Sequence, residues 1–228
     1  MTTGCRPEPF FSLVTVTRNN RSGLQKTASS IDAQMDRNFE WIVIDGASSD
    51  GTGLFLETLA AARAPAFAVR FLSEPDRGIY DAMNKGLVRA RGAYLLFLNA
   101  GDRLAGPDVL KTIRAAAQGA SYDIVYGDAW EDREGLDPVL KPARTHRQIA
   151  RGLFTHHQAI FYRRHALQEL SYDLRYLVAM ISESSLEATA SGDPELRVVF
   201  LDATDSTEAD RPAWRWLLQR RAHAPDAG

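Results

Sequence analysis

The sequence predicts an α/β fold in which helices cover both faces of a doubly wound, mostly parallel β-sheet. Two apolar runs, residues 41–44 and 94–98, each lead into an aspartate, Asp45 and Asp102. Apolar runs of this length are typical of strands that are buried on both faces of a parallel sheet. Strand-like and helix-like segments also alternate along the first half of the chain, which predicts right-handed β-α-β connections.

The predicted elements begin with a strand over residues 10–17, which is rich in β-branched and aromatic side chains and precedes a turn-forming cluster at 18–20. The first helix is predicted by residues that recur at three- and four-residue steps, namely Leu24, Thr27, Ala28, Ile31 and Met35. Further strands are expected at 40–45, 67–72, 94–98 and 122–128, and further helices at 54–62, 79–90 and 109–117. Residues 132–142 are charged and carry Gly and Pro, so an exposed hairpin or loop is expected there.

Length and composition fit one domain over residues 1–228, with a short C-terminal extension from about residue 203. The formal net charge of -2 gives no support for nucleic-acid binding, and the single cysteine, Cys5, excludes an internal disulfide. Residues 1–9 lack the apolar core of a signal peptide, and no apolar stretch approaches the ~18 residues of a membrane span. We therefore expect a cytoplasmic protein, with a position at the inner face of the membrane left open.

Asp45 is expected at the ligand-binding edge of the sheet, because ligands of open α/β sheets bind beyond the carboxyl ends of the strands. The small residues after it would let a ligand approach the backbone, so this carboxylate is a candidate partner for a nucleobase or a ribose. The alternative is a turn in which Asp50 or Ser49 caps the next helix. Neither the GxxxxGK[ST] nor the GxGxxG spacing of phosphate-binding loops is present.

Asp102 is expected at the same edge, in the loop 99–102. A divalent ion that bridges a diphosphate needs only one or two protein carboxylates in addition to phosphate oxygens and water. A single aspartate on such a loop therefore suffices for a metal site. The alternative is a turn built on Gly101.

Five segments of the chain, taken in order, resemble one known family. They are residues 10–19, the Ile-Asp-Gly-x-Ser-x-Asp-Gly-Thr run at 44–52, the Glu-Pro-Asp-Arg-Gly-Ile-Tyr-Asp-Ala-Met-Asn-Lys-Gly run at 74–86, the Leu-Asn-Ala-Gly-Asp loop at 98–102 and the His-Gln-Ala-Ile-Phe-Tyr-Arg-Arg run at 157–164. Together they are similar to family 2 glycosyltransferases, above all to the branch that builds bacterial exopolysaccharides and glycolipids. The resemblance runs from about residue 10 to 176, and the ordered set is more specific than any one segment.

This resemblance implies a GT-A fold and an inverting transfer from a nucleotide-diphosphate sugar to a hydroxyl of a glycan or of a lipid-linked acceptor. It also implies a divalent metal cofactor, Mn²⁺ or Mg²⁺. Carried over by position, the nucleotide-binding residues would be Asp45, Asp76, Arg77, Asn84 and Lys85. The metal-binding residues would be Asp102 and His157, since a neutral imidazole is a competent ligand. A histidine that is merely packed is the alternative for His157.

Two positions depart from the family pattern. Many members have an aspartate where this chain has Asn99, so Asp102 is left as the main anionic ligand and metal binding is expected to depend more on substrate phosphates. The usual position of the general base is occupied by Ile181. An inverting transfer needs a carboxylate that takes the acceptor proton. Glu183 is the candidate base, and Glu187 is the second choice. On a helix, Glu183 lies about 200° around the axis from Ile181, nearly opposite the usual position of the base. Two alternatives therefore stay open: Glu183 is a solvated carboxylate, or the protein has lost its activity.

Two other functions are compatible with the sequence. Ile181 and Asn99 favour a non-catalytic relative that binds nucleotide sugars as a partner subunit. A sugar nucleotidyltransferase would need a glycine-rich basic loop after the first strand, but residues 17–23 supply two arginines without a glycine cluster, so this function ranks third.

The tail at 211–221 mixes aromatics and arginines in a helix-compatible run that suits a peripheral membrane contact. Packing of the tail on the main domain is the alternative.

Overall fold

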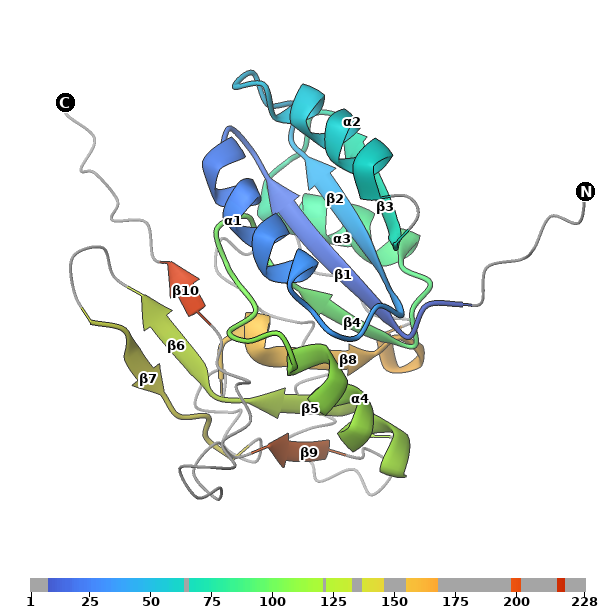
Figure 1. Cartoon of the computed structure of the whole chain (residues 1–228), viewed down its shortest axis with the longest axis vertical. Coiled ribbons are helices and arrows are strands. Elements are labelled where there is room, and N and C mark those ends of the chain that lie inside the picture. The colour runs from blue at the N-terminus through green and yellow to red at the C-terminus, as the bar shows by residue number, and fades with distance from the viewer. Residues whose placement is uncertain are drawn as a thin grey trace, which may run out of the picture.

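The computed structural model describes residues 8–63, 66–120, 122–132, 137–145, 155–167, 198–201 and 217–219. Within these residues the main sheet consists of β1 (Phe11–Thr17), β2 (Phe39–Asp45), β3 (Ala68–Ser73), β4 (Tyr94–Phe97), β5 (Ile124–Gly127), β8 (Ile160–Arg163) and β9 (Val198–Leu201). Their order across the sheet is β3-β2-β1-β4-β8-β5-β9. β8 runs antiparallel to both of its neighbours, and the other pairs are parallel. The predicted mostly parallel sheet is therefore confirmed (Figure 1).

Helices cover both faces of this sheet, as predicted. They are α1 (Arg21–Asp32), α2 (Thr52–Arg63), α3 (Ile79–Arg89) and α4 (Val109–Ala120). Buried residues of α1, α2 and α4 pack against one set of strand side chains, and those of α3 pack against the other set. A smaller sheet follows β5 in the chain and has the order β10-β6-β7, from β6 (Ala129–Asp132), β7 (Val139–Lys141) and β10 (Leu217–Gln219).

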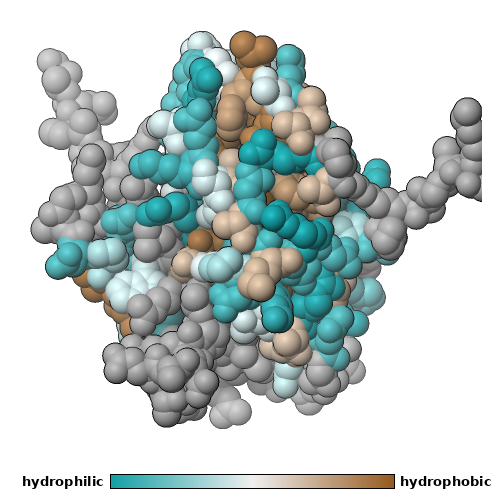
Figure 2. Space-filling model, viewed as in Figure 1, coloured by the Kyte–Doolittle hydropathy of each residue, from teal (hydrophilic) through white to brown (hydrophobic). Residues whose placement is uncertain are grey.

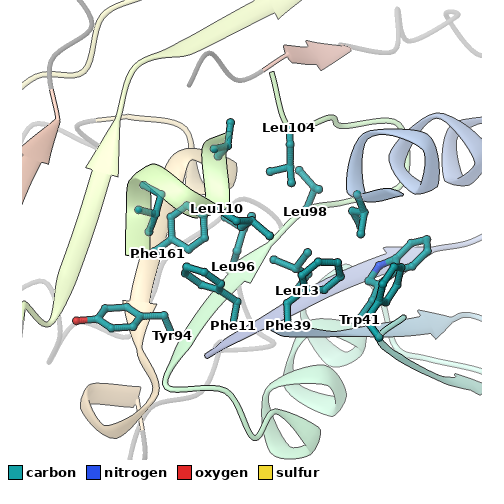
Figure 3. Close-up of a cluster of buried hydrophobic side chains, with 14 of the residues drawn as sticks. Phe11, Leu13, Phe39, Trp41, Tyr94, Leu96, Leu98, Leu104, Leu110 and Phe161 are labelled. Atoms are coloured by element: carbon teal, nitrogen blue, oxygen red, sulfur yellow. The ribbon is translucent and has the colours of Figure 1, made fainter. Parts of the chain in front are cut away.

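Alternate side chains of each strand supply the two core layers. Phe11 and Leu13 of β1 join the layer that α1 covers, whereas Val14 joins the layer that α3 covers. Figure 3 shows the first layer, in which side chains from β1, β2, β4 and β8 lie together. Trp41 is fully buried there, and its indole N–H donates to Thr15 Oγ1 at 2.9 Å, which satisfies its polar group. This packing fixes the strand ends that carry the candidate site.

The structure corrects the predicted extent of the first helix. The helix ends at Asp32, so Met35 lies beyond it and is 63% exposed rather than on the buried helix face. The chain turns at this point because Met35 N donates to Pro107 O at 2.7 Å and the following residues lead into β2. Met35 thus contacts the rest of the fold through its backbone N–H, whereas its side chain is exposed.

Two predictions for the second half of the chain have different outcomes. The hairpin expected over 132–142 is present as β6 and β7, an antiparallel pair that begins earlier, at Ala129. In the tail, the prediction of a helix-compatible run is wrong for Leu217–Gln219. These residues instead form β10, which pairs parallel with β6. The backbone groups of these three residues are satisfied by a neighbouring strand instead of by a helix.

The sequence pattern does not predict β8 as a member of the main sheet. A short 3-10 turn, η2 (His157–Ala159), precedes this strand, which pairs with β4 on one side and β5 on the other. Because β8 is antiparallel, its first residue lies where the neighbouring strands end. The insertion therefore brings η2 to the same edge of the sheet as Asp45 and Asp102.

The surface in the view of Figure 2 is largely hydrophilic over the described residues, and apolar groups gather at the top, where α2 lies in Figure 1. Leu54 of α2 is 72% exposed. Across the described ranges, no helix combines the length and the apolar character that crossing a membrane requires.

Candidate functional site

The carboxyl ends of β1, β2 and β3 form one side of the candidate site. Thr17, Asp45 and Ser73 end these strands and are neighbours in register. Asp45 is fully buried, and its carboxylate accepts hydrogen bonds from Ser73 Oγ at 2.6 Å, from Ser48 N at 3.2 Å and from Ser48 Oγ. The carboxylate thus finds its partners within the protein and fixes the loop after β2 against the end of β3.

The loops after β1 and β2 are also fastened to each other. Asn19 N donates to Ser48 Oγ at 2.7 Å. Asp50, a candidate helix cap in the sequence, accepts from Thr52 N at 3.2 Å and from Arg21 N at 2.9 Å. It therefore joins the start of α2 to the start of α1, and both loops are held in place around the strand ends.

Asp76 lies directly over Gly46, the residue that follows Asp45. A Cβ atom at position 46 would collide with Asp76 Oδ2 and would lie 3.2 Å from Arg18 Cδ. The lack of a side chain at Gly46 thus lets both residues approach the strand end. Arg18 is exposed and adds a cation that the sequence pattern does not single out. The sequence feature that could have identified Arg18 is its position directly after the first predicted strand.

The other predicted nucleotide-binding residues lie on α3 or just before it. Arg77 is exposed, and its guanidinium pairs with Asp81 Oδ1 at 3.1 Å. Lys85 Nζ contacts Glu74 Oε1 at 2.9 Å and Asp81 Oδ2 at 3.4 Å, and the hydrogen bond with Glu74 does most to raise the pKa of Lys85. Asn84 is half-buried on the same helix. Lys85 therefore fastens the loop before α3, and its contact with a nucleotide stays a prediction.

The loop after β4 is fastened to α1 and to the end of β1. Ala100 N donates to Val16 O at 3.1 Å, which continues the pairing of β4 with β1 beyond the strand. Thr27 Oγ1 of α1 accepts from Gly101 N at 3.0 Å and donates to Asp102 O at 2.8 Å. Gly101 has a φ of 109°, a conformation that glycine adopts without strain. These contacts fix Asp102 at the edge where the sequence predicts it.

The Asp102 side chain is a buried carboxylate with one side-chain donor. Asp102 is 6% exposed and accepts from Gln158 Nε2 at 2.8 Å. Burial raises the pKa of Asp102 to about 7, although the hydrogen bonds from Gln158 and at Asn99 lower it. His157 Nε2 lies 3.3 Å from Asn99 Nδ2, and burial, followed by the charge of His156, lowers the pKa of His157 to about 4. The imidazole is therefore neutral at pH 7, whereas the protonated and ionised forms of Asp102 are both populated at that pH.

The residues around Asp102 fit a divalent cation. Asn99 Oδ1 and Gln158 Oε1 are buried, and neither has a hydrogen-bond partner among the described residues. An unpartnered buried carbonyl oxygen costs free energy, which a bound cation would remove. Together with Asp102 and the neutral His157 they give a donor set with one carboxylate, which suits an ion that also binds phosphate oxygens. In the described part of the chain, no three His, Cys, Asp or Glu side chains gather as a metal site, so a metal ion here would also need amide or substrate oxygens as ligands.

The predicted base, Glu183, lies outside the described residues, as do Ile181 and Glu187. A further carboxylate that the sequence pattern does not single out, Asp128, stands at the sheet edge directly after β5. It is 1% exposed and accepts from Ala143 N at 2.8 Å. Its place at the end of the fifth predicted strand is the signal that identifies it, as for Asp45 after the second strand.

Two relatives show how far the sequence is shared with known proteins. The chain is 35% identical over 191 residues to an uncharacterized glycosyltransferase of Mycobacterium tuberculosis (strain ATCC 25618 / H37Rv), with 82% of this chain and 71% of that protein aligned. It is 36% identical over 184 residues to a PGL/p-HBAD biosynthesis glycosyltransferase of Mycobacterium bovis (strain BCG / Pasteur 1173P2), with 75% of this chain and 66% of that protein aligned.

Two solved structures have a similar fold. S. aureus TarS 1-349 in complex with UDP-GlcNAc superposes with a TM-score of 0.68 at 19% identity, over 94% of this chain and 59% of TarS 1-349. The mannosyltransferase PcManGT from Pyrobaculum calidifontis, in complex with GDP-Man and Mn²⁺, superposes with a TM-score of 0.64 at 16% identity, over 92% of this chain and 57% of PcManGT. The chain thus spans under three fifths of these structures. At such identities the likeness concerns the fold, which is the GT-A fold.

A family model agrees with both comparisons. The model described as Glycosyl transferase family 2 matches residues 12–178, a range that includes Asp45, Asp76, Asp102 and η2. The match covers well over half of the chain and includes both sides of the candidate site. The chain therefore belongs to glycosyltransferase family 2.

Proposed function

We propose that this protein transfers a sugar from a nucleotide-diphosphate sugar to a hydroxyl of a glycan or lipid-linked acceptor, with a divalent metal and with inversion at the anomeric carbon. The observation that carries the proposal is the edge at Asp102, where a buried carboxylate and a neutral imidazole accompany two unpartnered amide oxygens. The complexes of TarS with UDP-GlcNAc and of PcManGT with GDP-Man and Mn²⁺ support a nucleotide-sugar donor. The PGL/p-HBAD biosynthesis relative supports a glycolipid or glycan acceptor.

The nucleoside would lie over the ends of β1, β2 and β3. Asp76 and Arg77 would line this side of the site, with Asn84 and Lys85 behind them on α3. Asp45 is fully buried and hydrogen-bonded, so it would serve the nucleoside mainly by fixing the loop on which the base or ribose rests.

Asp102, His157, Asn99 and Gln158 would hold the metal ion, whose charge stabilises the leaving diphosphate. His157 is uncharged at neutral pH because its pKa is lowered to about 4, and its Nε2 would exchange its contact with Asn99 Nδ2 for the ion. Asp102, with a pKa raised to about 7, exchanges a proton for the ion. Metal affinity is therefore expected to increase as the pH rises through 7.

The acceptor hydroxyl must lose its proton as the new bond forms, and Glu183 is the proposed base. Glu183→Gln should leave donor affinity intact and lower kcat by about 10²–10⁴-fold, the range typical of general-base loss. Ile181→Asp places a carboxylate where the family usually has its general base, and tests whether a base at that position raises turnover. Full turnover in Glu183→Gln, together with higher turnover in Ile181→Asp, would show that the native chain lacks an efficient base.

Donor binding is tested by thermal unfolding with UDP-, GDP-, TDP- and CDP-sugars, each with and without Mn²⁺. A ligand at 100 times its Kd adds about 2.7 kcal/mol to the free energy of unfolding, which shifts the midpoint measurably. We expect one nucleotide class to stabilise the protein, and Mn²⁺ to increase the effect. The proposal fails if no nucleotide sugar stabilises the protein under either condition.

A non-catalytic role as a nucleotide-sugar-binding partner subunit is the second candidate function, and Ile181 and Asn99 favour it. Donor binding without transfer, in the parent and in both base variants, would support this role. One domain with a C-terminal extension, a cytoplasmic location and a peripheral membrane contact of the tail stay predictions.

A further inference from the structure

One stripe of α1 meets the segment after β4 through polar side chains. Helix faces that pack inward ordinarily carry apolar residues at three- and four-residue steps. Here a stripe at steps of seven, three and four residues, on α1 and at its two ends, carries Asn20, Thr27, Ser30 and Gln34. Thr27 and Gln34 are buried. Figure 1 shows the chain between β4 and α4 as it passes alongside α1. The helix therefore holds this segment by directed hydrogen bonds.

The polar side chains of the stripe bond to the backbone of the segment at several points along its length. The contacts are Asn20 Nδ2 donating to Ala100 O at 2.9 Å, Leu104 N donating to Ser30 Oγ at 3.2 Å, Gln34 Nε2 donating to Gly106 O at 2.6 Å and Leu110 N donating to Gln34 Oε1 at 3.1 Å. A backbone group cannot swing away as a side chain can. The stripe therefore fixes the course of the chain from the loop after β4 to the start of α4.

Thr27 is the member of the stripe that bonds to the peptide groups around Asp102. It is fully buried, and its Oγ1 accepts from Gly101 N at 3.0 Å. A hydroxyl has one hydrogen to donate, and the shortest contact of this one with an acceptor is with Asp102 O at 2.8 Å, whereas its other contacts with acceptors are at 3.3 Å. One hydroxyl thus bridges the peptide group before Gly101 and the peptide group after Asp102.

These contacts set the direction in which the Asp102 side chain leaves the backbone. Asp102 N donates to Asn99 O at 2.9 Å, and Asp102 O accepts from Thr27. With both backbone groups held, the place of Cβ is determined, because it follows from the positions of N, Cα and C. Asn99 and Asp102 are both proposed metal ligands, and the turn that joins them is the part of the loop to which Thr27 bonds.

We propose that Thr27, supported by Asn20, is a positioning residue for the metal site: its hydroxyl holds the side chains of Asp102 and Asn99 in the arrangement that a divalent cation requires. The inference rests on the proposed metal site at Asp102, and it assigns part of the metal affinity to a helix residue that is not itself a ligand. Without this bond the loop would adopt several arrangements, and the apparent affinity would fall in proportion to the fraction that still presents both oxygens.

Thr27→Val tests the inference, because valine keeps the branched shape of threonine but has no hydroxyl. Calorimetric titration of the full chain with Mn²⁺ at pH 8, alone and with UDP or GDP, should give an affinity about 10-fold below that of the parent, as is typical when a contact that orients a metal ligand is lost. Thr27→Ser restores the hydroxyl and should return the affinity close to that of the parent.

Thr15→Val is the matched control. Thr15 is also fully buried, and its hydroxyl accepts from the indole N–H of Trp41 at 2.9 Å, within the core. The substitution leaves that N–H without its acceptor, so it should lower the free energy of unfolding. It should not change the Mn²⁺ affinity measured below the unfolding midpoint. The control therefore separates a general loss of stability from a loss of positioning.

Equal Mn²⁺ affinity in Thr27→Val and the parent would overturn the inference and leave the metal site at Asp102 standing. A matching loss in Thr15→Val, or no recovery in Thr27→Ser, would also overturn it, since the effect would then come from packing and not from the hydroxyl. A parent that binds no Mn²⁺ under any of these conditions would contradict both the inference and the proposed metal site.

Asn20→Ser keeps the test decisive if Thr27→Val does not fold. Asn20 Oδ1 caps α1 by accepting from Gly23 N at 3.2 Å, and serine is a comparable cap that lacks the donor to Ala100 O. Lower Mn²⁺ affinity in this variant, at unchanged stability, would support the positioning role of the stripe. Unchanged Mn²⁺ affinity would contradict it.

Discussion

The two buried carboxylates of the candidate site, Asp45 and Asp102, differ in how far the protein satisfies the polar groups next to them. Asp45 is fully buried and accepts hydrogen bonds from Ser48 and Ser73. Asp102 is almost as buried and has one side-chain donor, while the neighbouring oxygens of Asn99 and Gln158 have no partner among the described residues. The Asp45 carboxylate is satisfied without a ligand, although Thr17 Oγ1 on the same side has no partner among the described residues, whereas a cation beside Asp102 would give two buried amide oxygens the partner that they lack.

This difference separates two uses of a buried carboxylate. A carboxylate whose partners are all within the chain holds loops together, and its removal is expected to reduce stability. A carboxylate with a raised pKa beside unpartnered oxygens keeps binding capacity for something outside the chain. Burial alone does not distinguish the two; the number and kind of hydrogen-bond partners does.

The largest expected effect is on metal binding by Asp102→Asn. Removing one partner of a buried charge pair costs about 2–5 kcal/mol, which corresponds to a roughly 30- to 4,000-fold loss of Mn²⁺ affinity. Without metal at pH 8 the variant should be at least as stable as the parent, because it no longer buries a charge. Mn²⁺ titration and thermal unfolding measure the two quantities. Unchanged Mn²⁺ affinity would remove Asp102 from the metal site.

Asp45→Ala should show the reverse pattern. The donors of Ser48 and Ser73 would lose their acceptor, which should lower the free energy of unfolding by about 1–3 kcal/mol. Mn²⁺ affinity should not change, whereas nucleoside monophosphate should bind less tightly because the loop after β2 is loosened. Urea unfolding and nucleotide titration test this, with Asp45→Asn as the milder control. A stability equal to that of the parent would contradict the structural role.

Gln158→Leu tests whether the amide supports the metal. The substitution removes both the donor to Asp102 and the unpartnered Oε1, and loss of such supporting contacts typically lowers metal affinity about 10–100-fold. Gln118→Leu, at an exposed position of α4, is the matched control. If both variants bind Mn²⁺ as the parent does, Gln158 has no part in the site.

The smallest effect concerns the pH dependence of stability without metal. The folded pKa of Asp102 is raised from 3.8 to about 7, so its contribution to the free energy of unfolding is present at low pH and declines as the pH rises from about 4 to 7. The folded pKa of His157 is lowered from 6.5 to about 4, so its contribution is present above pH 6.5 and is lost as the pH falls to 4. The two contributions oppose each other, so the net pH dependence that they give the parent should be smaller than that of a variant that lacks one of the two groups.

Single substitutions should reveal each contribution. Between pH 4 and 7, Asp102→Asn is expected to gain stability relative to the parent as the pH rises, because the declining contribution is gone. His157→Gln should lose stability relative to the parent over the same range. Urea unfolding at several pH values gives both slopes. Parallel curves for the parent and both variants would show that neither group titrates as the structure indicates.

Most of the fold could be predicted from the sequence, because strands buried on both faces produce apolar runs and amphipathic helices show three- and four-residue steps. The placement of Asp45 and Asp102 at one edge follows from the same reasoning and is confirmed. Which strands are neighbours does not follow from periodicity. The insertion of β8 between β4 and β5 depends on long-range pairing, and Gln158, which comes to Asp102 only through that insertion, could not be found from local pattern. The balance of hydrogen bonds that separates Asp45 from Asp102 likewise depends on three-dimensional contacts.

The antiparallel insertion of β8 also bears on the order in which the site is assembled. Gln158 and Asp102 are 56 positions apart, and the chain between them forms α4, β5 and the β6–β7 hairpin. During synthesis from the N-terminus, β1, β2 and β3 have all emerged long before β8 exists, so the nucleotide side has its parts early and the metal side late. A metal ion at the proposed site would find half of its proposed ligands missing from the growing chain until β8 is in place. Tight metal binding would then indicate a chain in which β8 has taken its place in the sheet.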